Sequence, residues 1–133
     1  MTGAELFMVT VIVPAMDDAV AHYTRDWGFS LVADSSHVSG HRWVEIGTRG
    51  GMRLRLAEAS DEAQRVSIGQ QAGGRVAFFL RSHSFDVDVA QLQLNGITLL
   101  EPERTEQYGR VVVLADKYGN RWDLIEAQAS NLQ

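Results

Sequence analysis

Cysteine is absent from this sequence of 133 residues, lysine occurs once, and no apolar run reaches the length of a membrane-spanning helix. Without thiols, the chain has no thiolate nucleophile, no disulfide framework and no thiolate-ligated zinc or iron–sulfur site. Residues 1–5 also lack the basic stretch and apolar run that begin a secretory signal. We therefore expect a cytoplasmic protein with no membrane partner.

The charged residues are unbalanced in sign and in type. Seventeen acidic residues against 12 basic ones give a formal net charge of −5, which would repel a phosphate backbone and makes nucleic acid an unexpected partner. Lys117 is the only lysine, so the basic residues are nearly all arginines, whose planar guanidinium suits carboxylate or phosphate groups. A GC-rich genome would produce the same bias, so the position of each arginine must decide its role.

The composition is that of one globular domain. Apolar residues make up 45% and charged residues 22% of the chain, as in ordinary folded proteins. A chain of this length buries roughly two-thirds of its unfolded surface, so its core needs no disulfide or structural metal.

The first half of the chain predicts a strand, a helix and three further strands. The β-branched run 7–13 ends at Pro14, which cannot continue a ladder of hydrogen bonds. Apolar residues at steps of three and four predict a helix over 16–27, ended by Gly28. The three strands that follow are expected at 29–33, 41–46 and 52–57.

The second half repeats this order after a polar linker, 59–74, that has a short helix in its middle. A helix is predicted over 84–95, closed by Gly96. The strands are predicted at 75–80, 97–100, 108–115 and 121–126.

The two halves match at a constant spacing, which indicates an internal duplication. The intervals from Met8 to Arg75, from Gly28 to Gly96 and from Arg55 to Asp123 are 67, 68 and 68 residues. Each half then has one helix to cover one face of its sheet, which leaves the other face free. We predict an α+β fold in which two tandem βαβββ modules with curved mixed sheets form a cleft. The single domain spans 1–133, with modules at 7–58 and 75–126, a linker at 59–74 and a C-terminal tail at 127–133.

Three segments carry a resemblance to a known family. They are the pattern Val-x-Val-Pro with Tyr and Trp-Gly-Phe within 11–29, Gly-Gly-Arg-Val at 73–76, and Asp-Lys-Tyr-Gly-Asn-Arg-Trp-Asp-Leu at 116–124. Together they resemble the vicinal oxygen chelate superfamily, which includes glyoxalase I, extradiol dioxygenases, fosfomycin-modifying enzymes and bleomycin-resistance proteins. The likeness spans about residues 7–126, and it implies the paired βαβββ fold, a small-molecule ligand and a homodimer. One scaffold hosts several chemistries, so the function must come from the residues of the site.

Strand alternation predicts which side chains face the cleft, because successive residues point to opposite sides of a sheet. In this arrangement Asp123 would pair with one guanidinium and leave another to hold an anionic or carbonyl-bearing ligand. The alternative is a structural network of ion pairs with no ligand. Trp43 would add to the apolar walls or, like Trp122, belong to the core. The predicted ligand-binding set is Met8, Thr10, Ile12, Trp43, Arg53, Arg55, Arg75, Phe79, Asp123 and Ile125.

The resemblance also implies where a metal would bind. Metal-dependent members use one His, Gln or Glu from each of four strands, and the matching positions here are Met8, Arg55 (or Arg53), Arg75 and Asp123. Only Asp123 suits a hard cation, and two guanidiniums would repel a dication. We therefore expect no metal and no cofactor.

The histidines do not favour a relocated metal centre. His22, His37 and His83 are expected to be solvated surface residues on the first helix, in a turn and before the second helix. His41 and Glu45 share one face of a strand, as a solvent-facing polar pair also would. Scattered histidines without ligand spacing are weak signals of a metal site.

Three functions remain open at this point. The first is a metal-free binding protein, similar to bleomycin-resistance proteins, that holds an apolar or aromatic ligand of either charge in its cleft. The second is a glyoxalase-like lyase, isomerase or dioxygenase with a degenerate or relocated metal site, in which Asp123 would be the general base and Arg75 the electrophilic stabiliser. The third is an assembly module without a ligand.

Overall fold

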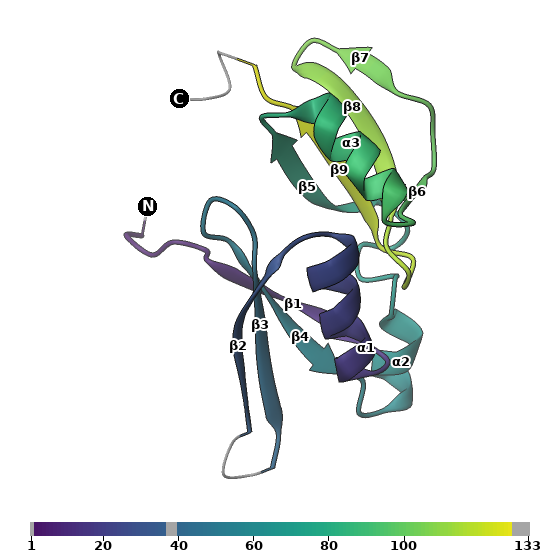
Figure 1. The fold of residues 1–133 in the computed structure, drawn as a ribbon. Helices are drawn as coiled ribbons and strands as arrows, with labels where there is room; N and C mark the ends of the chain where they lie inside the picture. Colours follow the sequence, from purple (N-terminus) through teal and green to yellow (C-terminus); the bar gives the residue numbers. More distant parts are fainter. Residues whose placement is uncertain (1, 37–39, 129–133) are drawn as a thin grey trace. The chain divides into compact units, whose positions relative to one another are not determined.

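The protein has two mixed sheets with few helices, as its computed structural model shows for residues 2–36 and 40–128 (Figure 1). The chain divides into two compact units, unit 1 (Met1–Ser67) and unit 2 (Ile68–Gln133), and each holds one sheet. The predicted α+β class with two mixed sheets is confirmed. None of the helices in the described part has the length and apolar character needed to cross a lipid bilayer.

The sheet of unit 1 has four strands in the order β1-β4-β3-β2. The first and last strands of the unit, β1 and β4, run parallel, whereas β4, β3 and β2 are joined as antiparallel neighbours. The parallel pair needs a long connection, which the helix and the hairpin between β1 and β4 provide. The bounds are β1 Met8–Val13, β2 Ser30–Ser36, β3 Arg42–Gly47 and β4 Arg53–Glu58.

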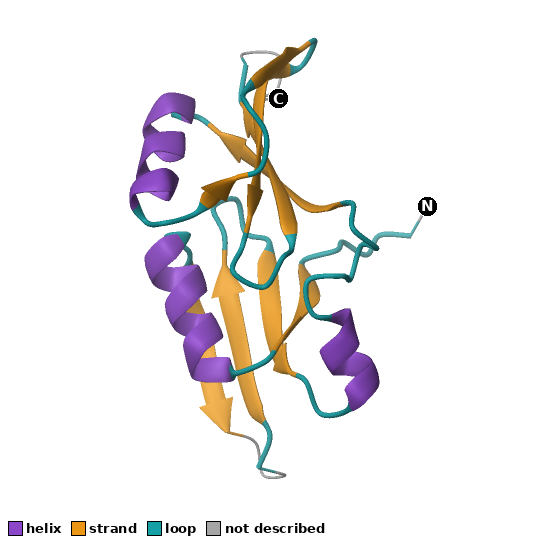
Figure 2. Cartoon of the chain, turned by 90° about the vertical axis from the view of Figure 1, so that its right-hand side faces the viewer, coloured by secondary structure: helices purple, strands orange, loops and turns teal. Residues whose placement is uncertain are grey.

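One face of this sheet forms the core of unit 1. Alternate apolar residues of three strands are buried on it, and α1 (Met16–Ala21) packs there through Met16 and Ala19 (Figure 2). Phe7, the first residue of the predicted strand 7–13, lies before β1 and is exposed. The buried strand residues are Val11, Val13, Val44, Ile46, Leu54 and Leu56.

The predicted helix 16–27 changes its winding halfway. After α1 the chain forms a π-helical turn, η1 (His22–Asp26), whose wider winding shifts the side chains relative to a regular helix. His22, the first residue of η1, is buried, and the predicted surface position is wrong. Its Nδ1 lies 2.7 Å from Asp26 Oδ2, and Trp27 Nε1 donates to its Nε2 at 3.1 Å. Gly28, with a φ of 78°, follows Trp27 as predicted.

The sheet of unit 2 repeats the strand order of unit 1. Its path is β5-β9-β8-β6, again with a parallel pair, β5 and β9, and with β7 paired to β8. The short helix predicted within the linker is present as α2 (Glu62–Ser67) and belongs to unit 1. The remaining bounds are β5 Val76–Ser82, α3 Phe85–Leu94, β6 Thr98–Leu99, β7 Arg104–Glu106, β8 Gly109–Ala115 and β9 Arg121–Glu126.

The core of unit 2 lies between its sheet and α3. Trp122 is fully buried, as predicted, and its ring lies 4.4 Å from that of Phe78 between centroids. Val112, Leu114 and Leu124 are buried on the same face as Trp122. Alternation along β9 therefore sends Asp123 to the opposite face of the sheet.

The turn between β8 and β9 is built around one buried carboxylate. Asp116 Oδ1 accepts the backbone N–H groups of Tyr118 and Asn120, and its Oδ2 accepts Asn120 Nδ2 and Trp122 Nε1, all at 3.0 Å. Gly119, in the same turn, has a φ of 97°, which favours glycine. This turn sets the start of β9, and hence the position of Asp123.

Other differences from prediction lie at strand ends. β2 extends to Ser36, beyond the predicted strand 29–33, and β7 was not predicted. β5 begins at Val76 rather than Arg75, and its register with β9 shifts between Val76 and Phe78. His37 lies outside the described residues.

Candidate functional site

The first candidate surface is the face of the unit 1 sheet opposite α1, here called the open face of unit 1. Because Val11, Leu54 and Leu56 point to the core, their neighbours Thr10, Ile12, Arg53 and Arg55 point the other way. Five of the predicted ligand-binding residues share β1 and β4, and Trp43 lies on the adjacent β3. The open face carries Met8, Thr10, Ile12, Trp43, Glu45, Arg53 and Arg55.

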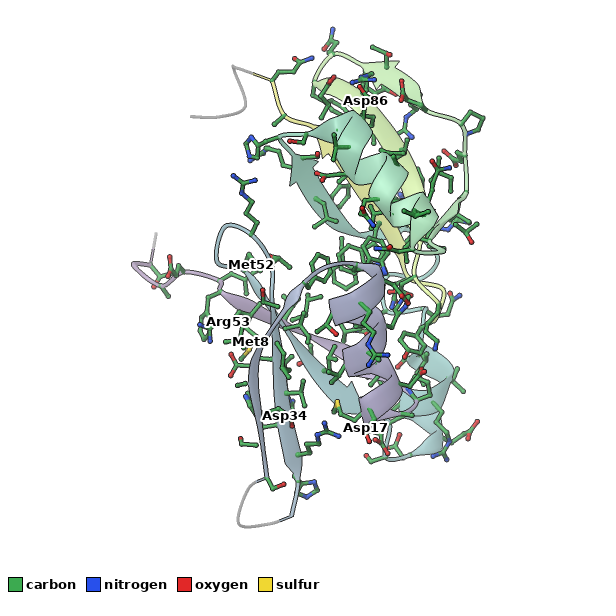
Figure 3. The ribbon with its side chains drawn as sticks, viewed as in Figure 1. Met8, Asp17, Asp34, Met52, Arg53 and Asp86 are labelled. Atoms are coloured by element: carbon green, nitrogen blue, oxygen red, sulfur yellow. The ribbon has the colours of Figure 1, made fainter. Side chains whose placement is uncertain are left out.

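Strand register brings these side chains together. In the parallel pair Met8 lies opposite Arg53, and Thr10 lies opposite Arg55, while Glu45 of β3 lies opposite Arg55 on its other side. Figure 3 shows Met8 and Arg53 close together on β1 and β4. Side chains directly opposite on one face of a sheet are in contact range, so the charged and apolar groups form one continuous surface.

Glu45 is the centre of a polar network on this face. Its Oε1 accepts a hydrogen bond from Arg53 Nη1 at 2.7 Å, and its Oε2 accepts one from Trp43 Nε1 at 2.8 Å. These two donors, Trp43 first, hold the pKa of Glu45 below its ordinary value. Glu45 is therefore an anion whose two oxygens both have partners, and it neutralises Arg53.

Arg55 differs from Arg53 in its partners. Its guanidinium carbon lies 4.4 Å from the centroid of the Trp43 ring, a cation–π contact. Its Nε is buried and has no hydrogen-bond partner, and no acidic residue of the described chain forms an ion pair with it. Trp43 is thus half-buried on the open face and stacked, not in the core, so its alternative interpretation as a core residue is wrong.

The second candidate surface is the face of the unit 2 sheet opposite α3, here called the open face of unit 2. Asp123 occupies it, paired with Phe79 of β5 and Val113 of β8. Phe79 is 64% exposed, whereas Asp123 is only 5% exposed, and the Oδ1 of Asp123 has no hydrogen-bond partner. Ile125 follows on the same face of β9, as alternation predicts.

Burial dominates the electrostatics of Asp123. Loss of solvent raises the pKa of this carboxyl above its ordinary value, the positive charge of Arg104 opposes the shift, and the negative charge of Glu101 adds to it. Arg104 is itself shared, because its Nε donates to Glu106 at 2.9 Å and its Nη1 lies 3.6 Å from Glu101. Asp123 is therefore a poorly solvated carboxyl that lacks a full counterion.

Arg75 does not fill the role expected of it beside Asp123. It precedes β5 and is exposed, and it forms no ion pair with Asp123. The register shift in β5 explains the displacement, because Val76 lies opposite Arg121 in the place that Met8 occupies opposite Arg53 in unit 1. The guanidinium whose charge acts on Asp123 belongs to Arg104 instead.

The role of Arg104 could not be predicted from the sequence, because its strand, β7, has three residues and lacks the apolar alternation that marks a strand. Glu45 was considered only as a partner of His41, which is exposed and lies before β3. The signal that would have found Glu45 is cross-strand register, which places it opposite Arg55 once β3 and β4 are paired.

Two of the four residues that the resemblance places at metal-ligand positions do not fit a divalent ion. Met8 offers a thioether and Arg55 a guanidinium, and neither is a ligand for a hard cation. In the part of the chain that the structure describes, no three histidine, aspartate or glutamate side chains gather in a way that would hold a metal. His83 is exposed, as predicted, and His22 is buried against Asp26 and Trp27.

A family model and a relative both match most of the chain. The family model described as Glyoxalase/Bleomycin resistance protein/Dioxygenase superfamily matches residues 5–124. An uncharacterized protein of Shewanella frigidimarina (strain NCIMB 400) is 38% identical over 121 residues, which is 89% of this chain and 90% of that protein.

Two solved structures share the fold over nearly their whole length. UcmS2 superimposes with a TM-score of 0.80 at 23% identity, covering 93% of this chain and 98% of that one. TnmS3, described as an antibiotic binding protein from Streptomyces sp. CB03234, gives a TM-score of 0.74 at 25% identity, with 96% of this chain and 99% of that chain covered.

Proposed function

Since the chain belongs to the Glyoxalase/Bleomycin resistance protein/Dioxygenase superfamily, we propose that it is a binding protein that holds a small apolar or aromatic molecule without a metal ion. The observation that carries this proposal is the stack of Arg55 on Trp43, set beside apolar side chains on the open face of unit 1. Ligand sites are typically lined by apolar and aromatic groups with a few placed polar groups, and this face has that composition.

The chemistry at the metal positions supports binding without a metal. Met8 and Arg55 both lie on the open face of unit 1, and the family resemblance implies metal ligands at these two positions in metal-dependent members. A fixed positive charge at such a position repels a dication, and a thioether does not replace an imidazole or carboxylate. The similarity to TnmS3, an antibiotic binding protein, favours an organic ligand of the same general kind.

A titration of chelator-treated protein tests this function. We expect planar aromatic compounds to bind, as measured by isothermal titration calorimetry, and the affinity to stay unchanged when Ni²⁺, Zn²⁺ or Mn²⁺ is added back. Trp43→Leu removes the aromatic platform and should weaken binding about tenfold, whereas Trp43→Phe should weaken it less. Loss of binding on chelation, recovered by one metal, would refute the metal-free proposal.

Asp123 favours a second candidate, a glyoxalase-like lyase, isomerase or dioxygenase. A buried carboxyl with a raised pKa and an unpaired oxygen is suited to take up a proton from a bound substrate. Arg75 was the expected electrophilic partner, and Arg104 is the cation that acts on Asp123. In this case Asp123→Asn would abolish turnover and leave the dissociation constant of the substrate nearly unchanged. An equal loss of binding would favour a binding role for Asp123.

Two further expectations stay predictions. The compartment is expected to be the cytoplasm. A homodimer is expected from the family resemblance, and light scattering at micromolar concentration tests it. A mass of 14.7 kDa, that of one chain, would refute the dimer.

A further inference from the structure

We infer that the ligand of the open face of unit 1 is an aromatic organic anion, such as a carboxylate, and that Arg55 binds its charged group; this inference rests on the proposed function.

The charges on this face decide between an anionic and a cationic ligand. Three ionised side chains lie there, and two of them, Glu45 and Arg53, neutralise each other at 2.7 Å. Glu45 also accepts the indole N–H of Trp43, so both of its oxygens have partners. The three side chains together carry a net charge of +1, which repels a cationic ligand, whereas an anion meets the remaining positive charge of Arg55 without displacing any group.

The missing hydrogen-bond acceptor at Arg55 also favours an anionic ligand. Its Nε is buried and has no acceptor on the described chain. Leaving a buried donor without a partner is costly, and charge-assisted bonds to a guanidinium are among the strongest that a ligand gains. An oxyanion of the ligand would supply the missing acceptor, and the flat guanidinium accepts two carboxylate oxygens side by side.

The site is also rigid, which favours a planar ligand over a flexible one. Trp43 is held by its hydrogen bond to Glu45, and Arg55 is held against the Trp43 ring at 4.4 Å. The indole and the guanidinium over it share the open face of unit 1 with the apolar side chains of Met8 and Ile12. A fixed donor loses little freedom on binding, so the charged group of the ligand adds directly to its affinity.

Matched probes test the inference. We would titrate the full chain with the carboxylate, the carboxamide and the methylammonium derivatives of naphthalene and of anthracene. The carboxylates should bind about 10- to 100-fold more tightly than the carboxamides, and the ammonium compounds should bind least.

Variants assign the effect to Arg55. Arg55→Gln should bring the affinity for the carboxylate down to that for the carboxamide and leave the carboxamide affinity within about threefold. Arg55→Lys should retain part of the preference because it keeps a positive charge, and the retained carboxamide affinity of Arg55→Gln shows that this variant is folded. Arg25→Gln is the matched control, since it removes one positive charge from an exposed position on η1 and should leave all affinities unchanged.

The failure of the inference differs from the failure of the function. Equal binding of carboxylate and carboxamide, or tighter binding of the ammonium compounds, overturns the inference while ligand binding stands. A preference for carboxylates that survives in Arg55→Gln overturns the role of Arg55. If no compound in any of the three series binds, the proposed function and the inference both fall.

Discussion

Replacement of Asp116 by alanine should strongly destabilise the turn that leads into β9. The carboxylate is buried and accepts four hydrogen bonds at 3.0 Å from Tyr118, Asn120 and Trp122. The side chains of Asn120 and Trp122 are themselves buried, so at least two donors would lose their partner away from solvent. Each such donor costs about 1–3 kcal/mol, and entry of water recovers part of the loss, so we expect a decrease of about 3–5 kcal/mol in the free energy of unfolding.

Urea denaturation followed by far-UV circular dichroism measures this decrease. Asp116→Asn provides a graded comparison, because its amide oxygen still accepts the backbone N–H groups of Tyr118 and Asn120 while its NH₂ faces two donors. Its loss should fall between those of the wild type and the alanine variant. Trp122→Phe removes a single bond and should lose about 1–2 kcal/mol from that bond and the smaller ring. A loss under about 1 kcal/mol in Asp116→Ala would refute the claim that this carboxylate holds the turn.

Three further predictions concern the stability of the two units. Asp123→Asn should stabilise the protein at neutral pH. The pKa of Asp123 is raised in the folded protein, so stability is lost as pH rises through that pKa. The free energy of unfolding, measured from pH 4 to 8, should therefore depend less on pH in the variant. Gly69→Ala should lower the free energy of unfolding in urea by more than about 3 kcal/mol, because Gly69 has a φ of 73° and an added Cβ would collide with a backbone carbonyl. Gly73→Ala, with a φ of 64° and open space around it, should lower it by about 1–2 kcal/mol. Arg110 lowers the pKa of Glu126, so the contribution of this ion pair to stability is present above the ordinary pKa of 4.5 and is lost as pH falls below it. Arg110→Gln should therefore make thermal stability less sensitive to acid over that range. An unchanged pH profile would contradict the role of this ion pair.

Much of the fold follows from local patterns in the sequence. The β-branched run that forms β1, the glycine at 28 after the first helix and the constant spacing of the two halves can each be identified in the sequence alone. The π-helical turn at 22–26 is different, because the apolar positions there also fit a regular helix. His22 begins that turn and is buried, although the sequence predicts a surface position for it.

The candidate site could be predicted only where strand alternation determines the face to which a side chain points. Alternation assigned Thr10, Arg55 and Asp123 to the faces opposite the helices, which follows from the period of two along a strand. It failed at Arg75, because the register shift in β5 breaks that period. It also failed to find Arg104, whose effect on Asp123 depends on the pairing of β7 with β8, which lies beyond local sequence.

The indole N–H resonances of the three tryptophans test the central claim most directly. Trp43 Nε1 donates to Glu45, whereas Trp27 and Trp122 donate to buried groups in the cores of units 1 and 2. On adding an aromatic carboxylate to ¹⁵N-labelled protein in the presence of EDTA, we expect the Trp43 resonance and the Nε–H resonance of Arg55 to shift, with those of Trp27 and Trp122 nearly unchanged. A bound ligand that leaves the Trp43 and Arg55 resonances in place would contradict the account.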